Sequence, residues 1–207
     1  MIAFLAVTAC FGLYVWLRWP RPSLPPDVVA RRAMEAFVNG DYATLLGYVN
    51  EEEKELLNLN EESLAECVNR LYKPNTKGFK PSGEVVLHQA SERDALAMQG
   101  YTHPDGRKFQ VSILVAAGER DAEVYGLVFF LVQASLHAKM PPEVVSAGGP
   151  AFRQGLLEAF EEELPVLTSL KIPGDTVSGD GRQIFRSWDD MHKHFKERAS
   201  RSASSAR

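Results

Sequence analysis

Apolar residues in the first half of the chain recur every three or four positions, which is the spacing of one face of an α-helix. The first such stretch predicts a helix over residues 27–39 with an apolar face of Val29, Ala33, Ala36 and Phe37. Gly40 suits the left-handed conformation that ends a helix, and Asp41 can cap a second helix that begins at Tyr42. A further helix is expected over 61–72, because Pro74 stops it soon after residue 72.

A second helix-start signal lies at Asn50, which precedes three glutamates. Asparagine is a favourable N-cap, and acidic residues in the first turn suit the positive end of the helix dipole. Glu53 is placed to close a capping box, in which its side chain returns to the backbone of Asn50. The first half of the chain is therefore expected to be a series of short helices.

Beyond Pro81 the pattern changes to runs that are rich in β-branched and aromatic residues and are separated by turn-forming residues. The runs lie at 83–91, 95–103, 108–118 and 122–138. They predict four antiparallel strands in meander order, with Asp105 and Gly106 in the tightest hairpin turn. The last two runs are apolar on both faces over much of their length, so we expect both faces of these two strands to be covered.

Two amphipathic stretches follow the strands. The first predicts a helix over 151–164 with Phe152, Leu156, Phe160 and Leu164 on one face. The second predicts a helix over 188–198, capped by Ser187, with Trp188, Met191 and Phe195 on one face. The chain is thus expected to hold a domain at 27–138, a helical C-terminal extension at 139–199 and a small, polar, disordered tail at 200–207.

The N-terminus carries a run of sixteen uncharged, mostly apolar residues at 2–17. At a rise of 1.5 Å per residue the run is about 24 Å long as a helix, against about 30 Å for the hydrocarbon core of a bilayer. Tyr14, Trp16 and Trp19 suit the membrane interface. We therefore predict a single membrane-anchoring helix at 1–19 and an extended, Pro-rich spacer at 20–26.

Three alternatives to the anchor remain. A cleaved signal peptide would need a basic stretch before the run and a small-residue cleavage site after it, and the sequence has neither. "VTAC" at 7–10 resembles a lipoprotein cleavage box in which Cys10 is lipidated, and a buried core helix is the third alternative.

The orientation of the predicted anchor follows from the basic residues near it. All of them come after the apolar run, namely Arg18, Arg21, Arg31 and Arg32. Because basic residues favour the cytoplasmic side, this count places the domain in the cytoplasm.

Composition excludes some classes of function. The 207 residues carry a net charge of −4, whereas a nucleic-acid-binding domain normally presents a basic surface, so no nucleic-acid partner is expected. Cys10 and Cys67 lie in dissimilar segments and predict no disulfide. No serine elbow, phosphate loop or glycine-rich dinucleotide fingerprint occurs, so no cofactor is predicted.

A metal site at "WDDMHKHF", residues 188–195, is not expected either. His192 and His194 are two positions apart on the predicted helix and point in nearly opposite directions, whereas metal ligands on a helix are three or four positions apart. This segment is predicted to be a polar helix surface.

Helices followed by a run of antiparallel strands form an α+β order. The leading helix, the "NGDY" break at 39–42, the second helix that begins "YATLLGYV" and the strands that follow resemble the nuclear transport factor 2-like superfamily. This resemblance covers residues 27–138 and implies a cone, in which N-terminal helices pack on a curved antiparallel sheet with a pocket between them. The superfamily includes ketosteroid-isomerase-like enzymes and membrane-anchored domains without assigned activity. The latter favour an extracytoplasmic domain for this chain.

The resemblance does not carry the isomerase chemistry over. Those enzymes use an aspartate base with a tyrosine and a protonated aspartate as oxyanion donors. Between Val85 and Leu136, all the acidic residues of this sequence lie in or beside predicted turns, so no carboxylate is expected on the pocket wall. The weak pocket candidates are polar residues of the helices and strands, namely Tyr42, Tyr48, His88, Tyr101, Gln133 and His137, with the last two at the end of the fourth predicted strand. None is assigned a catalytic role.

The sequence therefore favours a membrane-anchored, non-enzymatic module that binds a ligand or another protein. The first alternative is a small-molecule isomerase or cyclase-like enzyme that uses the cone pocket, and the second is a structural subunit of an envelope complex. The expected partners are the membrane, a second copy of the chain or an envelope protein, and a small apolar ligand. The extension is expected either to close the cone or to present a surface to a partner chain.

Overall fold

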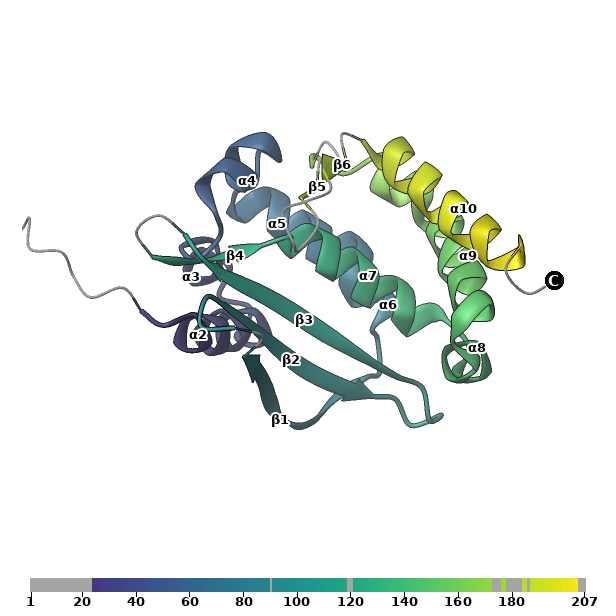
Figure 1. Ribbon diagram of the computed structural model, residues 1–207, viewed down its shortest axis with the longest axis horizontal. Helices are drawn as coiled ribbons and strands as arrows, with labels where there is room; N and C mark the ends of the chain where they lie inside the picture. The colour runs from purple at the N-terminus through teal and green to yellow at the C-terminus, as the bar shows by residue number, and fades with distance from the viewer. Residues whose placement is uncertain are drawn as a thin grey trace, which may run out of the picture.

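The computed structural model describes residues 24–89, 91–118, 121–172, 176–177, 184–185 and 187–204. The predicted membrane helix at 1–19 and the first four residues of the predicted spacer lie outside the described residues. Within the described ranges, no helix combines the length and the apolar character needed to cross a bilayer. The described chain has an α+β fold with a four-stranded, curved antiparallel sheet and helices (Figure 1).

In the part of the chain that the structure describes, six helices precede the sheet. They are α2 (Pro26–Asn39), α3 (Tyr42–Leu46), α4 (Glu51–Leu56), α5 (Glu61–Cys67), the π-helix η1 (Val68–Tyr72) and α6 (Lys73–Asn75). Gly40 ends α2 at φ +71°, and Asp41 caps α3 by accepting a hydrogen bond from the Thr44 N–H at 3.1 Å. Both of these predictions are confirmed. The helical segment that begins at Glu61 continues through η1 and α6 to Asn75, three residues beyond the predicted end at residue 72, so the stop predicted at Pro74 is wrong.

The sheet consists of β1 (Lys80–Gln89), β2 (Asp94–Thr102), β3 (Lys108–Ala117) and β4 (Ala122–Tyr125), paired in that order. This arrangement confirms the predicted antiparallel meander. The turn between β2 and β3 contains Asp105 and Gly106 as predicted, and Gly106 has a φ of +94°. The prediction that both faces of the third strand are covered is wrong, because side chains on one face of β3 are buried while those on the other range from half-buried to exposed.

The fourth predicted strand is the largest correction to the sequence analysis. Strand β4 ends at Tyr125, and the rest of that run forms helix α7 (Leu127–Lys139), so Gln133 and His137 lie on a helix. Gly126 makes the break, because its φ of +66° is left-handed and does not continue the extended backbone of β4. Helix α7 then packs against β3.

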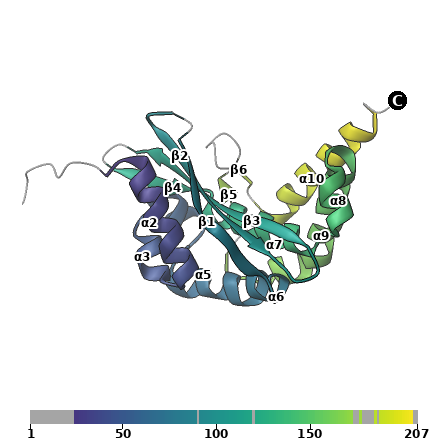
Figure 2. The same cartoon turned by 90° about the horizontal axis from the view of Figure 1, so that it is seen from below.

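Helix α2 packs across the sheet and forms the main core with it. The sheet contributes buried small and β-branched residues to this core, namely Ala95, Ala97, Val111, Ile113 and Val115. Helices α2, α3 and α5 gather on one side of the molecule, whereas α8, α9 and α10 form a separate group at the other end (Figure 2). The main core therefore lies between α2 and the sheet, and the extension lies apart from α2 (Figure 2).

The C-terminal extension contains α8 (Pro142–Ala147), α9 (Gly149–Leu167) and α10 (Trp188–Ser204), with a short hairpin of β5 (Thr176–Val177) and β6 (Ile184–Phe185). Helix α8 is not predicted by the sequence. The apolar stripes of α9 and α10 bury against each other, with the Phe160 and Phe195 rings 5.1 Å apart, and α9 also packs on α7 and η1. Helix α10 continues to Ser204, so the prediction of a disordered tail from residue 200 is wrong for 200–204.

Candidate functional site

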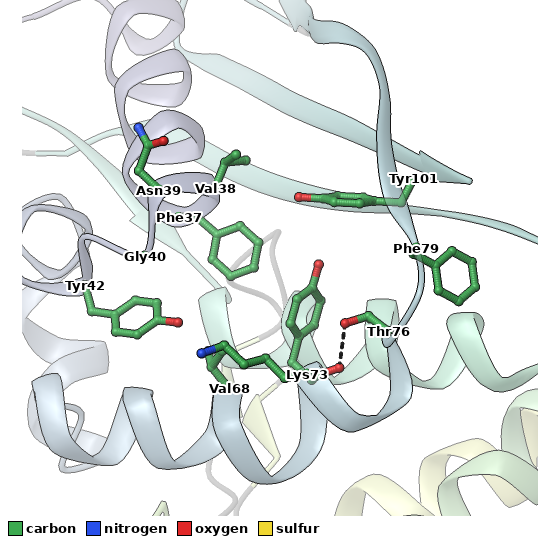
Figure 3. Close-up of a pocket in the computed structure, with 11 residues that line it drawn as sticks. Phe37, Val38, Asn39, Gly40, Tyr42, Val68, Lys73, Thr76, Phe79 and Tyr101 are labelled. Atoms are coloured by element: carbon green, nitrogen blue, oxygen red, sulfur yellow. Dashed lines mark hydrogen bonds between the residues drawn. The ribbon is translucent and has the colours of Figure 1, made fainter. Parts of the chain in front are cut away.

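A cavity of about 320 Å³ lies where α2 ends. Its wall comes from the last residues of α2, the start of α3, the η1 to α6 segment and strand β2, and consists of Phe37, Val38, Asn39, Gly40, Tyr42, Val68, Tyr72, Lys73, Thr76, Phe79 and Tyr101. In Figure 3 the hydroxyl groups of Tyr42 and Tyr101 point inward from opposite sides. We call this cavity the aromatic pocket.

Packed rings form the base of the aromatic pocket. Tyr72 meets Phe37 edge to face at 5.4 Å between ring centroids, and it meets the buried Phe109 at 6.3 Å. Tyr101 stacks on Phe109 at 4.9 Å with an interplanar angle of 8°. Phe109 and Tyr101 are register partners on neighbouring strands, so the sheet itself fixes the stack. The pocket wall is therefore rigid and largely apolar.

The Tyr72 hydroxyl is the unusual group of this pocket. Only 8% of the residue is exposed, and its oxygen has no partner at hydrogen-bond distance and angle among the described residues, although the neighbouring Tyr101 hydroxyl interacts with it outside that geometry. Burial, and after it the neighbouring Tyr101, raises the pKa of Tyr72, and burial also raises the pKa of Tyr42 and of Tyr101. All three phenols therefore stay protonated at neutral pH and can donate a hydrogen bond to a ligand.

Lys73 is the one charged residue in the wall of the aromatic pocket. It is exposed, and its ammonium group donates a hydrogen bond to Asn69 Oδ1 at 2.9 Å. Thr76 is oriented by a hydrogen bond of 2.8 Å from its hydroxyl to the Tyr72 carbonyl, which Figure 3 marks. The polar groups thus consist of hydrogen-bond donors, an ammonium at the rim and an amide from Asn39, without a carboxylate.

The structure brings two of the six predicted site residues together, because Tyr42 and Tyr101 both line the aromatic pocket. Tyr48 is half-buried against the core outside it, and His88 is exposed on β1. Gln133 lines a second, smaller cavity, and the His137 ring packs edge to face on Phe152 at 4.9 Å.

Tyr72 and Lys73 are pocket residues that the sequence analysis missed. Tyr72 follows Val68 by four positions and therefore lies on the same face of the predicted helix. This spacing is the one sequence signal that could have placed Tyr72 beside the other pocket residues. The sequence offers no comparable signal for Lys73.

Buried carboxylates exist in this protein but lie away from both cavities. Glu53 is 1% exposed and Glu163 is 8% exposed. Glu163 pairs with Lys139 at 2.6 Å. Glu53 does not close the predicted capping box, because its carboxylate accepts hydrogen bonds from the Gly126 and Leu127 N–H groups at 2.8 and 3.0 Å. Asn50 still caps α4, by accepting a bond from the Glu53 N–H at 3.1 Å.

Two acidic residues that were expected in or beside turns lie within strands, Asp94 as the first residue of β2 and Glu123 in β4. Glu123 lies within β4, where its carboxylate accepts hydrogen bonds from Asn50 Nδ2 at 2.6 Å and from the Tyr125 hydroxyl at 3.1 Å. It does not line the aromatic pocket. The described wall of that pocket therefore offers no carboxylate base.

Among the described residues, no three histidine, cysteine or acidic side chains are grouped so that they could hold a metal ion. Within the "WDDMHKHF" segment, His192 contacts Glu161 of α9 at 2.8 Å and stacks on Phe160 at 5.7 Å. This histidine joins the two helices of the extension.

The chain matches no known family model, no curated protein and no solved structure.

Proposed function

We propose that this protein is a non-enzymatic binding module whose aromatic pocket takes a small, mostly apolar molecule that carries a hydrogen-bond acceptor. The observation that carries the proposal is the buried Tyr72 hydroxyl, which lies beside the Tyr101 hydroxyl but forms no hydrogen bond of normal geometry in a cavity of about 320 Å³. A buried polar group without a hydrogen bond is unfavourable, so a ligand that supplies an acceptor gains affinity from this hydroxyl. The volume lies within the range of small-molecule sites.

The lining of the pocket supports binding over catalysis. Its rings offer apolar surface, and the phenols and Lys73 offer donors, but no carboxylate or histidine is present to move a proton. The isomerase-like alternative requires such a base, so the pocket gives it no support. The extension packs on α7 and η1, and the aromatic pocket contains none of its residues. The extension therefore does not fill the aromatic pocket.

The finer arrangement belongs to the same proposal. We propose that residues 27–138 form a cone of the nuclear transport factor 2-like kind, with the aromatic pocket at its mouth, and that residues 1–19 anchor this domain to a membrane. Support comes from the "NGDY" break, which Gly40 and Asp41 build, and from the uncharged run at 2–17. Extraction of cell membranes with alkaline carbonate tests the anchor, because a chain without an anchor is released into the supernatant.

Binding is tested with 1-tetralone, a two-ring ketone, and with tetralin, the hydrocarbon of the same shape. NMR titration of the full-length chain should give saturable shifts at Tyr42 and Tyr101 with both molecules. Tyr72→Phe should weaken the binding of tetralone by about two- to tenfold and leave tetralin unaffected, because only the ketone accepts the hydrogen bond. Tyr48→Phe is the matched control, since Tyr48 is half-buried outside the pocket. The absence of saturable shifts with either molecule overturns the proposal.

A further inference from the structure

A second cavity, of about 160 Å³, lies between three helices at the other end of the molecule. Helix α7 supplies Gln133, α9 supplies four residues and α10 supplies the last two, so that the full lining is Gln133, Gly149, Phe152, Arg153, Leu156, Phe195 and Arg198. Figure 1 shows α9 and α10 side by side, with α7 next to them. The cavity shares no residue with the aromatic pocket. We call it the arginine cavity.

Arg153 is the informative residue of the arginine cavity. Its side chain is half-buried, and its Nε atom is fully buried without a hydrogen-bond partner. It forms no ion pair with any described residue, and no carboxylate lines the cavity. A partly buried guanidinium without a counter-charge is unfavourable, because desolvation is not offset by pairing.

Gln133 is the second polar group in the wall, and its amide is also without a hydrogen-bond partner among the described residues. The planar guanidinium of Arg153 matches a carboxylate, which accepts two parallel N–H bonds. An amide beside it can donate a further N–H bond to the same carboxylate. Arg198 contributes a second positive charge to the wall. The polar half of the arginine cavity therefore suits an anion.

The rest of the wall is apolar and comes from Phe152, Leu156 and Phe195. A protein cavity of about 150 Å³ holds a benzene-sized molecule, so a cavity of about 160 Å³ has room for one ring and little more. Inorganic anions fill the charged end but gain nothing from the rings. From this combination we infer that the arginine cavity binds a small carboxylic acid with an apolar body of about one ring, such as benzoate, held by Arg153 and Gln133.

The test is a titration of the full-length chain with benzoate, followed by the ¹H–¹⁵N NMR signal of the Arg153 Nε–H. The signal should shift in a saturable way with benzoate and stay unchanged with benzyl alcohol, which has the ring but no charge. Inorganic phosphate and decanoate separate the alternatives, because phosphate lacks the ring and decanoate exceeds the cavity. Tighter binding of either one than of benzoate overturns the assignment. Rising salt should weaken the binding of benzoate, as expected for a charge pair that solvent reaches.

Variants complete the test, and because Arg153→Met has no Nε–H, their titrations are followed by the backbone amide signals of Gly149 and Leu156, which also line the cavity. Arg153→Met keeps the length of the side chain and should weaken benzoate binding at least tenfold, whereas Gln133→Leu should weaken it two- to tenfold. Arg31→Met is the matched control, because Arg31 is an exposed arginine of α2 that lines neither cavity, and it should change the affinity less than twofold. If Arg153→Met fails to fold, Arg153→Lys keeps the charge without the planar fork and should still bind more weakly. Unchanged affinity in a folded Arg153 variant overturns the inference.

This site is independent of the aromatic pocket, so the two proposals fail separately. Arg153→Met should leave the binding of 1-tetralone unchanged, and Tyr72→Phe should leave the binding of benzoate unchanged. Loss of both ligands in one folded variant would contradict the separation of the two cavities.

Discussion

Glu53 caps helix α7 from 73 residues away, because its Oε2 atom accepts a hydrogen bond of 2.8 Å from the Gly126 N–H. Its other oxygen accepts from the Leu127 N–H at 3.0 Å. The first N–H groups of a helix have no partner inside the helix, and a carboxylate also suits the positive end of the helix dipole. One side chain of α4 thus holds the point where strand β4 turns into helix α7.

The Glu53 carboxyl should make folding depend on pH. Burial raises the pKa of Glu53 from 4.5 to about 7, against the two backbone hydrogen bonds, which lower it. Between these values the folded chain binds a proton that the unfolded chain has lost, so this contribution to stability is complete below pH 4.5 and is lost as the pH rises to about 7. Relative to the wild type, Glu53→Gln should therefore gain on the order of 3 kcal/mol as the pH rises through that window. Urea unfolding followed by circular dichroism measures it. Glu52→Gln, an exposed neighbour, should show no such trend.

His137 should act in the opposite direction. Burial lowers the pKa of His137 from 6.5 to about 4, so between these values the unfolded chain binds a proton that the folded chain does not. Its contribution is present above pH 6.5 and is lost as the pH falls toward 4. His137→Phe should therefore lose on the order of 3 kcal/mol relative to the wild type as the pH rises from 4 to 6.5. The same unfolding series tests it, and a difference that is constant with pH contradicts it. In the wild type the two residues partly cancel.

The extent to which the sequence predicts this fold depends on how local each signal is. Gly40 and Asp41 act on adjacent residues, so the first break between helices was predictable. The run from Leu127 to Ala138 is apolar on all sides, and such a run fits a buried strand and a buried helix equally well. The deciding features are the positive φ of Gly126 and the cap from Glu53, and the second comes from a distant part of the chain.

The candidate site shows the same limit. Tyr42 and Tyr101 were predictable because each lies at a helix start or a strand end, where the wall of a pocket forms. The unpartnered state of the Tyr72 hydroxyl depends on how η1 packs against α2 and β2, which no local pattern encodes. Arg153 was out of reach for a similar reason, since it stands in an amphipathic helix whose neighbours α7 and α10 were not placed.

Gly78 and Gly106 offer a test of the contact between the segment after α6 and the β2–β3 turn. Both have positive φ, of +88° and +94° respectively, so alanine should cost about 1–2 kcal/mol at either position. At Gly78 a Cβ atom would also lie 2.6 Å from His103 Nε2, whereas at Gly106 nothing lies within 4 Å. The His103 ring is held by Asp105 at 2.8 Å and by Phe79, so it cannot simply move aside.

Gly78→Ala should therefore destabilise the protein by about 1 kcal/mol more than Gly106→Ala does. Thermal and urea unfolding measure the difference. In the double variant Gly78→Ala/His103→Ala the extra cost should disappear, because the clashing ring is gone. Equal costs for the two single glycine variants would show that the His103 contact does not form.

Tyr72→Phe should differ from an ordinary core substitution in its effect on stability. The Tyr72 hydroxyl is buried and forms no hydrogen bond of normal geometry, so its removal costs at most its weak contact with the Tyr101 hydroxyl and ends a desolvation penalty. Without ligand, the variant should be as stable as the wild type or more stable by up to about 1 kcal/mol. Tyr125→Phe is the matched comparison, because the Tyr125 hydroxyl donates a hydrogen bond to Glu123 at 3.1 Å, and its loss should cost about 0.5–1.5 kcal/mol. Urea unfolding of both variants decides the matter. A clear loss of stability in Tyr72→Phe would mean that the hydroxyl already has a partner, which would remove the main support for a ligand in the aromatic pocket.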